Sequence, residues 1–412
     1  MNWNGKRVLI TGISGFVGPY LARHLLQLGA TVYGFNRRRA DGAVPSVLQY
    51  LRIAGEVILL EGDLLDITGL GSALDAAEPD FVFHLGSQSF VPRSFSAPQE
   101  TLEVNVRGTA NLLEAIRIKR ITPRIVFAGS SEEYGLVITS SSQLRRIIAR
   151  YGSVFPPATR LPELPVSESN PLRPMSPYAA SKVMGDFLMQ TFAASYGLDT
   201  VTSRAFNHEG AGRGTMFVTS AIVNQVMQLE YGERDSIVVG NVNAFRDWSH
   251  VEDVVGGYRI LAEAGQRGEV YNQGSQRTNS VIGYVLLTLE ASGYQVEAIE
   301  TMRTGKRVTQ PTEPNRMPFF GTAWEKTKVD QLLLEEEISF ELQDEGIWAH
   351  TNKGKVPIRF DPCRFRPAEV PILLSDTTKI RGLGFTVKHS LTDIIRDQIN
   401  YFLDPARRTP VV

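Results

Sequence analysis

The amino-acid sequence predicts an α/β protein: a doubly wound parallel sheet followed by a smaller C-terminal substrate-binding domain. Two observations lead to this prediction. Short apolar runs alternate with helical patterns over the first 130 residues, and such alternation produces a parallel sheet with helices on both faces. The first apolar run, Val8–Ile10, leads at once into a glycine-rich turn and an amphipathic helix, which is typical of a Rossmann fold. The length of 412 residues leaves room for a second domain.

The first element is a strand, a turn and a helix. Three glycines follow the strand at a spacing of three, and apolar residues then recur every three or four positions. This arrangement places a helix N-terminus beside exposed backbone N–H groups, which suits a dinucleotide pyrophosphate. The alternative is a glycine turn that serves packing only. We expect the cofactor to lie against Gly12, Ser14, Gly15, Phe16, Val17 and Gly18.

The second strand, Thr31–Phe35, ends in a basic run rather than in an acidic residue. A carboxylate here would bond the ribose hydroxyls of NAD, whereas guanidinium groups bind the additional phosphate of NADP. The alternative is a solvated basic turn. NADP is therefore predicted in preference to NAD, and the run comprises Asn36, Arg37, Arg38 and Arg39.

Three further strands are expected at 57–61, 81–85 and 125–128, and a long helix within 98–119. Ligands of such a sheet bind beyond the carboxyl ends of the strands. The residues that follow these strands should therefore meet the cofactor. They are Asp63 and Leu64 beside the adenine, and Leu85, Gly86 and Gln88 further along. The next stretch, 136–170, looks irregular and is interpreted as an insertion, a lid or a contact arm.

A tyrosine and a lysine lie four residues apart at the start of the next helix, which runs from Pro177 to about Tyr196. Tyr178 and Lys182 share a helix face. The ammonium is expected to lower the tyrosine pKa from about 10 toward neutrality, so that the tyrosine can take a proton from a hydroxyl group. The spacing alone is a weak signal, but its place after the fifth strand makes it persuasive.

Composition restricts the remaining possibilities. The net charge of −1 gives no reason to expect nucleic acid or an anionic membrane as a partner. The single cysteine, Cys363, excludes an intramolecular disulfide and a cysteine-based metal cluster, and fits the cytoplasm. Neither a membrane span nor a signal peptide is expected, since no apolar run is long enough and the N-terminus leads straight into a strand. The six histidines are scattered, so we expect no metal site.

Together these motifs resemble the extended short-chain dehydrogenases/reductases that modify nucleotide-linked sugars. The resemblance rests on Thr11–Gly18, His84–Ser89, Ser130-Ser-Glu132 and Tyr178-Ala-Ala-Ser-Lys182. It implies a homodimer or homotetramer, formed through the helices near 101–119 and 178–196. It also implies four catalytic residues, Ser130, Glu132, Tyr178 and Lys182.

The second half is similar to GDP-mannose 4,6-dehydratases in several motifs: Phe206-Asn-His-Glu209, Phe217-Val-Thr219, Arg246-Asp-Trp-Ser-His250 and Phe365-Arg-Pro-Ala-Glu-Val370. By that resemblance a GDP-sugar is the favoured substrate, and His208 and Arg213 approach the cofactor. The implied substrate residues are Ser89, Asn207, Val218, Arg246, Arg366 and Glu369. The chain departs from the pattern at Ser220-Ala221, at 211–214, at Ser130 in place of a threonine, and over 299–358.

The resemblance implies a sequence of reactions. Tyr178 removes the 4-hydroxyl proton, hydride passes to the cofactor, Glu132 removes the proton of carbon 5, water leaves from carbon 6, and hydride returns there. The alternatives are a reductase of GDP-4-keto-6-deoxymannose type, a C4 epimerase and a non-catalytic nucleotide sensor. The expected domains are 1–205, rejoined by a strand and helix near 237–272, and 206–412, with an insertion at 299–358.

Overall fold

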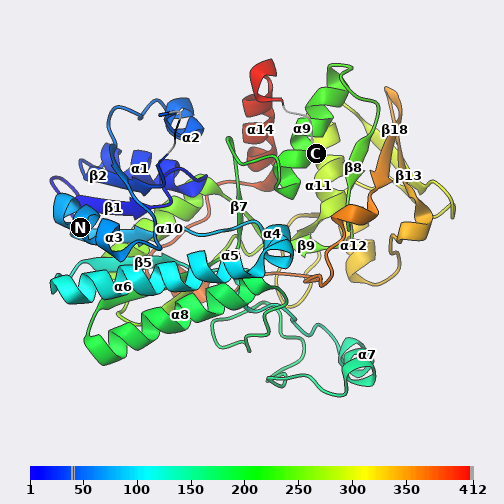
Figure 1. Ribbon diagram of the computed structural model, residues 1–412. Coiled ribbons are helices and arrows are strands. Elements are labelled where there is room, and N and C mark those ends of the chain that lie inside the picture. The colour runs from blue at the N-terminus through cyan, green and yellow to red at the C-terminus, as the bar shows by residue number, and fades with distance from the viewer. Residues whose placement is uncertain (39, 41, 409–412) are drawn as a thin grey trace.

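A seven-stranded parallel sheet forms the larger part of the computed structural model, which describes residues 1–38, 40 and 42–408 (Figure 1). Arg39, one of the four residues of the predicted basic run, lies outside the described residues. The strands lie in the order β3-β2-β1-β4-β5-β6-β11, so the chain reverses its winding between β1 and β4. Their bounds are β1 Arg7–Thr11, β2 Thr31–Asn36, β3 Ile58–Glu61, β4 Phe81–His84, β5 Arg124–Ala128, β6 Asp199–Ala205 and β11 Val270–Gln273.

Helices cover both faces of this sheet, as the doubly wound prediction requires. On one face α1 (Val17–Gln27) packs against α10 (Val251–Ala264). On the other face lie α3 (Ile67–Ala77), α6 (Gly108–Lys119) and α8 (Pro177–Tyr196). The long helix predicted within 98–119 is divided: α5 (Pro98–Leu102) joins α6 through a π-helical turn at Glu103–Arg107. The predicted fold class is confirmed.

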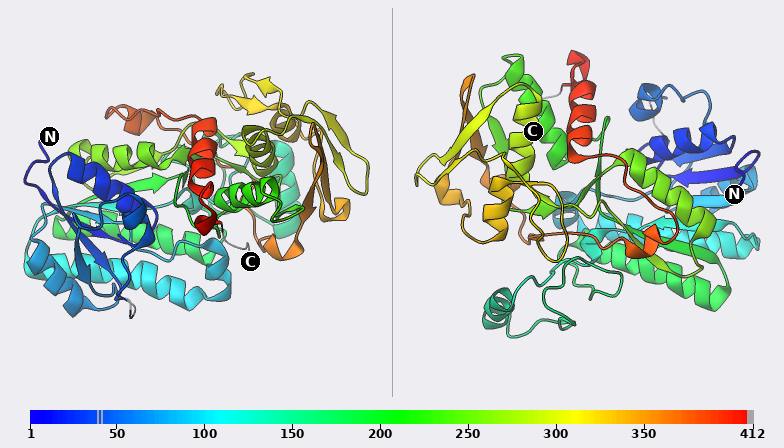
Figure 2. Two further views of the ribbon diagram at one scale, coloured as in Figure 1. Left: turned by 90° about the horizontal axis from the view of Figure 1, so that it is seen from above. Right: turned by 180° about the vertical axis from the view of Figure 1, so that it is seen from behind.

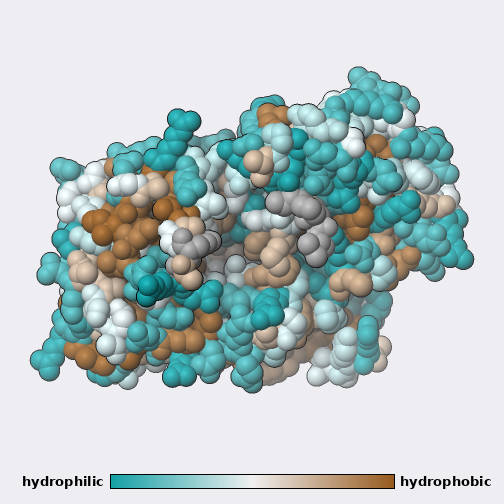
Figure 3. Space-filling model, turned by 45° about the horizontal axis from the view of Figure 1, so that its top comes forward, coloured by the Kyte–Doolittle hydropathy of each residue, from teal (hydrophilic) through white to brown (hydrophobic). Residues whose placement is uncertain are grey.

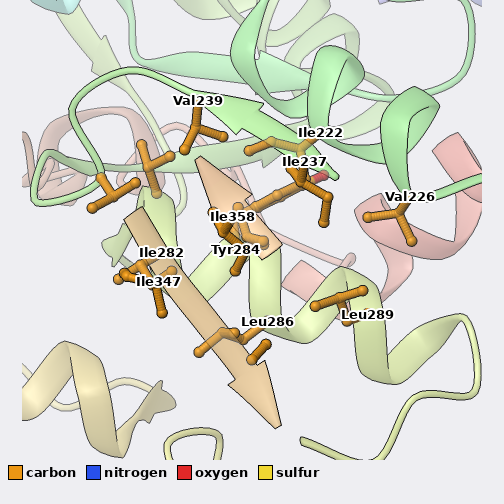
Figure 4. Packing of buried hydrophobic residues seen from close by; sticks show 14 of the residues in the cluster. Ile222, Val226, Ile237, Val239, Ile282, Tyr284, Leu286, Leu289, Ile347 and Ile358 are labelled. Atoms are coloured by element: carbon orange, nitrogen blue, oxygen red, sulfur yellow. The ribbon is translucent and has the colours of Figure 1, made fainter. Parts of the chain in front are cut away.

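A second, five-stranded sheet forms the other part of the molecule, beside the first (Figure 2). Its order is β14-β13-β17-β18-β8, and the segment without a recognised counterpart, 299–358, provides most of it. Three helices, α9 (Val218–Glu230), α11 (Val281–Ala291) and α14 (Leu391–Phe402), share one hydrophobic core with this sheet (Figure 4). The strands are β8 Ile237–Val239, β13 Val296–Thr301, β14 Arg307–Thr309, β17 Gly346–Thr351 and β18 Gly354–Phe360.

The segment that returns to the large sheet is shorter than the predicted 237–272. β8 pairs with β18 in the small sheet, and only α10 and β11 rejoin the large sheet. In the chain between β8 and α10, β10 (Trp248–His250) pairs in parallel with β7 (Asn207–Glu209). The difference has a physical reason: the apolar residues Ile237 and Val239 are buried in the core of the small sheet. The chain thus passes from the large sheet to β8 of the small sheet and back to β11, and β7 and β9, which lie on this route, carry predicted site residues.

The segment 136–170 contains an eleven-residue helix, α7 (Ser141–Tyr151), and the prediction of an irregular stretch is correct only for the residues outside this helix. Ser140 caps the helix by accepting from the N–H of Gln143 at 3.1 Å. None of the residues of α7 is buried, and the helix lies at the outside of the molecule (Figures 1 and 2), where Arg146 Nη2 comes within 3.9 Å of Glu336 Oε1. At the base of the segment a buried ion pair joins Glu163 to Arg173, with 2.8 Å between Oε2 and Nη1. Within the described ranges, no helix is long and apolar enough to cross a membrane.

Candidate active site

The glycine turn after β1 has little space for side chains. Gly12 has a φ of +77°, and a Cβ on it would lie 2.8 Å from the backbone nitrogen of Gly86. A Cβ on Gly18 would lie 2.7 Å from the carbonyl oxygen of Gly12. The N-cap of α1, Phe16, makes no side-chain cap hydrogen bond, and the first turn of the helix has no acidic residue. These N–H groups, with the positive end of the helix dipole, fit the pyrophosphate of a dinucleotide.

The basic run begins where β2 ends. The Asn36 side-chain amide donates to the carbonyl oxygen of Arg37 at 3.1 Å. The side chain of Arg38 is 82% exposed, and its Nε lies 3.7 Å from Oε2 of Glu61 at the end of β3. An exposed pair at this distance holds Arg38 only weakly. Arg37 and Arg38 therefore fit a phosphate beyond the edge of the sheet, although Glu61 competes for Arg38.

The ends of β3 and β4 place the other predicted cofactor residues. The Asp63 carboxylate accepts from the N–H of Leu65 at 2.9 Å, and Leu64 is buried. After β4, the N–H of Gly86 donates to Thr11 Oγ1 at 3.0 Å. The backbone of Gln88 is fixed by the Asn105 side chain, which accepts from its N–H at 2.7 Å and donates to its carbonyl at 3.0 Å. The chain between Leu85 and Gln88 therefore runs close to the glycine turn.

A pocket of about 420 Å³ begins where this segment ends. Gln88, Ser89 and Phe90 form one side, and Met216 and Phe217 form the other. Figure 3 shows the surface hollowed near the middle of this face, between the two halves of the molecule. Val218, the first residue of α9, follows Phe217 and is 38% exposed. The predicted substrate residues Ser89 and Val218 are thus brought to one region.

The four predicted catalytic residues meet at the carboxyl end of β5. Ser130 caps a short 3-10 turn, Ser131–Glu133, by accepting from the N–H of Glu132 at 3.2 Å. Ser130 also hydrogen-bonds the Tyr178 side chain at the start of α8. One turn later on α8, the Lys182 ammonium donates to the carbonyl of Ala128 at 2.7 Å. Ser130, Tyr178 and Lys182 are all buried.

The predicted effect of Lys182 on Tyr178 is not what the structure shows. Burial raises the pKa of Tyr178 to about 12, and the carboxylates of Glu132 and Glu133 contribute to the rise. The hydrogen bond from Ser130 and the charge of Arg213 oppose it. Burial lowers the pKa of Lys182 to about 8. The lysine ammonium points to a backbone carbonyl and lies 5.9 Å from the center of the tyrosine ring, so here Ser130 and Arg213, rather than Lys182, favour the phenolate.

A chain of alternating charges connects Glu132 with three predicted substrate residues. Glu132 Oε1 lies 3.4 Å from Arg366 Nη1, which lies 3.8 Å from Glu369 Oε1. The same Glu369 oxygen is 2.6 Å from Arg246 Nη2, and Arg246 Nη1 donates to the carbonyl of Val370 at 2.7 Å. β9 (Phe245–Arg246) and the segment after β18 bring these side chains together. Residues far apart in sequence thus form one polar surface beside the candidate base.

The crossing strand β7 and the turn that follows it carry three more predicted residues, of which Arg213 lies beside Phe16 of the glycine turn. Asn207 begins the strand, and His208 Nδ1 lies 2.9 Å from the carbonyl of Phe206. Burial, with Arg213 and Lys182, lowers the pKa of His208 to about 4, so the ring is neutral at pH 7. The Arg213 guanidinium lies 3.5 Å from the center of the Phe217 ring and 5.2 Å from that of Phe16. It therefore lies between Phe16, in the glycine turn, and Phe217, which lines the pocket.

Three buried charged residues behind the turn were missed by the sequence analysis. Glu133 forms a buried ion pair with Arg204, whose Nη2 lies 2.6 Å from Asp186 Oδ2. The sequence held a signal for the first of them, because Ser130 and Glu133 stand at the spacing of a capping box. Arg204 lies within β6, and no motif in the sequence marked it. Over the described part of the chain, no group of three or more His, Cys, Asp or Glu could hold a metal ion.

The glycine turn, the tyrosine–lysine helix and the crossing strands define a dinucleotide-dependent enzyme, and the family model that matches residues 8–274 carries the description "NAD dependent epimerase/dehydratase family". The chain belongs to this family, and the predicted enzyme class is confirmed. It is 30% identical over 412 residues to GDP-mannose 4,6-dehydratase of Yersinia enterocolitica, covering 98% of this chain and 95% of that protein. It is 27% identical over 412 residues to the human GDP-mannose 4,6 dehydratase, at 98% and 92% coverage.

Two solved structures show the same fold. UDP-glucose 4-epimerase from Bifidobacterium longum, in complex with NAD+ and UDP, superposes with a TM-score of 0.69 at 19% identity and covers 98% of this chain and 99% of its own. RMD from Pseudomonas aeruginosa, complexed with NADPH, superposes with a TM-score of 0.64 at 21% identity, covering 96% and 99%. One of these relatives was solved with NAD+ and the other with NADPH, so the fold itself is compatible with either cofactor.

Proposed function

We propose that the protein is an NADP-dependent nucleotide-sugar 4,6-dehydratase that acts on a GDP-sugar. The observation that carries this proposal is the position of Glu132. A dehydratase needs a base for the proton on carbon 5 in addition to the tyrosine that acts at carbon 4. Glu132 lies two residues from Ser130, which hydrogen-bonds Tyr178, and its carboxylate faces Arg366. The relatives named GDP-mannose 4,6-dehydratase, which match almost the full chain, support the same reaction and substrate.

The residues would divide the reaction as follows. A bound nicotinamide dinucleotide supplies one thing, the temporary acceptance of a hydride from the sugar. Tyr178 accepts the proton of the 4-hydroxyl, and Ser130 donates a hydrogen bond to the 4-oxygen. The 4-ketone makes the proton on carbon 5 acidic, Glu132 removes it, and hydroxide departs from carbon 6 as water with that proton. Carbon 6 would then receive the hydride back, and carbon 5 would regain one proton, which balances the proton that Tyr178 accepted. Arg246 and Arg366 would bind the diphosphate through charge-assisted hydrogen bonds.

The reaction class is tested by incubating the purified protein with a panel of nucleotide sugars and measuring product mass. The proposal predicts a loss of 18 mass units from a GDP-sugar, the mass of one water, with no net consumption of added cofactor. A product heavier by two hydrogens with NADPH consumed would identify a reductase. A product of unchanged mass and altered stereochemistry would identify an epimerase.

Glu132→Gln separates these outcomes within one protein, because it keeps the size of the side chain and removes its basicity. The variant should still bind the nucleotide sugar and oxidise carbon 4. Water loss should fall on the order of a hundredfold or more, the usual contribution of a positioned base. Unchanged dehydration by this variant would show that Glu132 is only a loop residue.

The proposed assembly is a homodimer, or a tetramer made of two such dimers, that pairs through α6 and α8. Those helices expose large apolar side chains that a monomer would leave in water, namely Ile118, Met184, Phe187 and Tyr196. We place the enzyme in the cytoplasm, because its single cysteine, Cys363, is free and exposed.

A further inference from the structure

A buried carboxylate lies directly behind the turn that carries Ser130 and Glu132. The side chain of Glu133 is fully buried, and its Oε1 accepts from the N–H of Ser130 at 2.7 Å. A Cβ on Gly129 would lie 2.7 Å from the same oxygen. The residue before Ser130 therefore has to be glycine for the carboxylate to occupy this place. Glu133 does not reach the pocket, so any influence on the reaction passes through its neighbours.

Charged and titratable groups surround Glu133 from every element packed against it. Arg204 of β6 places its Nε 3.2 Å from Glu133 Oε2. The same guanidinium donates to the Tyr134 hydroxyl at 3.1 Å and to the carbonyl of Glu168 at 3.2 Å. The remaining groups lie on α8, and each of them interacts electrostatically with Glu133: Tyr178, Lys182 and Asp186.

The charges in this cluster balance only when Lys182 is included. Arg204 alone faces two carboxylates, those of Glu133 and Asp186. Burial and Asp186 raise the pKa of Glu133, whereas Arg204, the Ser130 N–H and Lys182 oppose this rise. In return, Glu133 is the group that raises the pKa of Lys182 against the effect of burial. The carboxylate and the ammonium therefore depend on each other for their charge.

We propose that Glu133 is a positioning residue of this active site. Its Oε1 fixes the Ser130 turn through the backbone N–H, and the carboxylate, in its ionised form, favours the ammonium form of Lys182. This role rests on the proposed function for its effect on turnover, but its effect on Lys182 is independent of any substrate.

The chain offers a matched control. Glu163 is also a buried glutamate that accepts a backbone N–H at 2.7 Å, from Ile138, and pairs with an arginine, Arg173. It stands at the base of the α7 segment rather than behind the catalytic turn. Glu133→Gln and Glu163→Gln therefore remove the same charge from two similar surroundings. A loss that merely reflects a broken buried ion pair should appear equally in both variants.

The first measurement is a ¹³C NMR titration of the protein labelled at lysine Cε, with the Lys182 signal assigned from its loss in Lys182→Arg. Glu133→Gln should move the Lys182 midpoint to lower pH on the order of one unit, as expected when a nearby opposite charge is removed. Glu163→Gln should leave it in place. An unchanged Lys182 midpoint in Glu133→Gln would overturn the proposal, whether or not the protein turns over a nucleotide sugar.

The second measurement separates position from charge in turnover. Glu133→Leu removes both the acceptor and the charge, and should lower kcat on the order of a hundredfold with KM little changed, because the Ser130 turn loses its support. Glu133→Gln, which retains an acceptor oxygen, should recover most of kcat while keeping the altered pH profile. Equal losses of kcat in Glu133→Leu and Glu163→Leu would show that Glu133 has only a structural role. Absence of turnover in the parent would instead contradict the proposed function.

Discussion

Cofactor preference depends on a small set of exposed charges at the ends of β2 and β3. We propose that Arg37 and Arg38 bind the ribose phosphate of NADP, and Glu61 lies 3.7 Å from Arg38. A hydrogen bond to a charged group contributes about 1.5–3 kcal/mol, and exposure reduces this toward the lower end. Replacing both arginines with alanine should therefore weaken NADP binding by about 3 kcal/mol, on the order of a hundredfold. NAD, which lacks the phosphate, should bind as before.

Glu61→Gln is the complementary change. An exposed ion pair contributes about 0.2–1 kcal/mol, and releasing Arg38 from Glu61 should strengthen NADP binding by a factor of about 1.4 to 5. Calorimetric titration with NADPH and NADH measures the cofactor affinities of the parent, of the double arginine variant and of Glu61→Gln. When the titrations are repeated at a higher salt concentration, the preference for NADPH should become smaller. Equal affinity of the parent for both cofactors, or a parallel loss of both in the double variant, would refute the assignment of the basic run.

Three further outcomes are expected. Tyr178→Phe should unfold at a urea concentration within a few tenths molar of the parent's midpoint, but it should lose nearly all turnover. Full activity of this variant would show that Tyr178 has no part in the mechanism. Burial lowers the pKa of His84 to about 3 from the usual 6.5, so the folded state gains stability from a neutral ring above pH 6.5 and loses it as the pH falls. At pH 5 the loss should be on the order of 2 kcal/mol, and urea unfolding of His84→Asn, which cannot titrate, should show a smaller change between pH 7 and 5. Met184→Glu with Phe187→Glu should produce monomers in analytical ultracentrifugation, and an unaltered sedimentation coefficient would exclude α8 from the interface.

The first half of the fold was readable from sequence because its signals are local. Val8–Gly18 contains the signals of a strand, a turn and a helix within eleven residues, and the strands at 57–61, 81–85 and 125–128 are short apolar runs that end at a glycine or an acidic residue. The small sheet was not predicted, because its pairings join residues far apart, such as Ile237 with Ile358. Periodicity within one segment carries no information about such a partner.

In the candidate site, too, the features with local sequence signals were predictable and those that join distant residues were not. Tyr178 and Lys182 follow from spacing on one helix, but the contact of Glu132 with Arg366 joins residues 234 positions apart and could be expected only by resemblance. The sign of the Tyr178 pKa shift was wrong because helix spacing gives neither burial nor the direction in which the lysine points. In the fold, Lys182 donates to a carbonyl of β5.

The buried ion pair at the base of the α7 segment has a consequence for how this enzyme changes over evolutionary time. Ile138 and Glu163 are bonded in both directions, by the backbone at 2.8 Å and by the Glu163 side chain at 2.7 Å. The chain thus leaves and re-enters the body at one fixed point. The entropy of closing a loop grows only with the logarithm of its length, so residues can be gained or lost between 139 and 162 at small cost. Changes of length in this segment would therefore alter the surface that the enzyme presents to other molecules without disturbing the turn that carries Ser130 and Glu132.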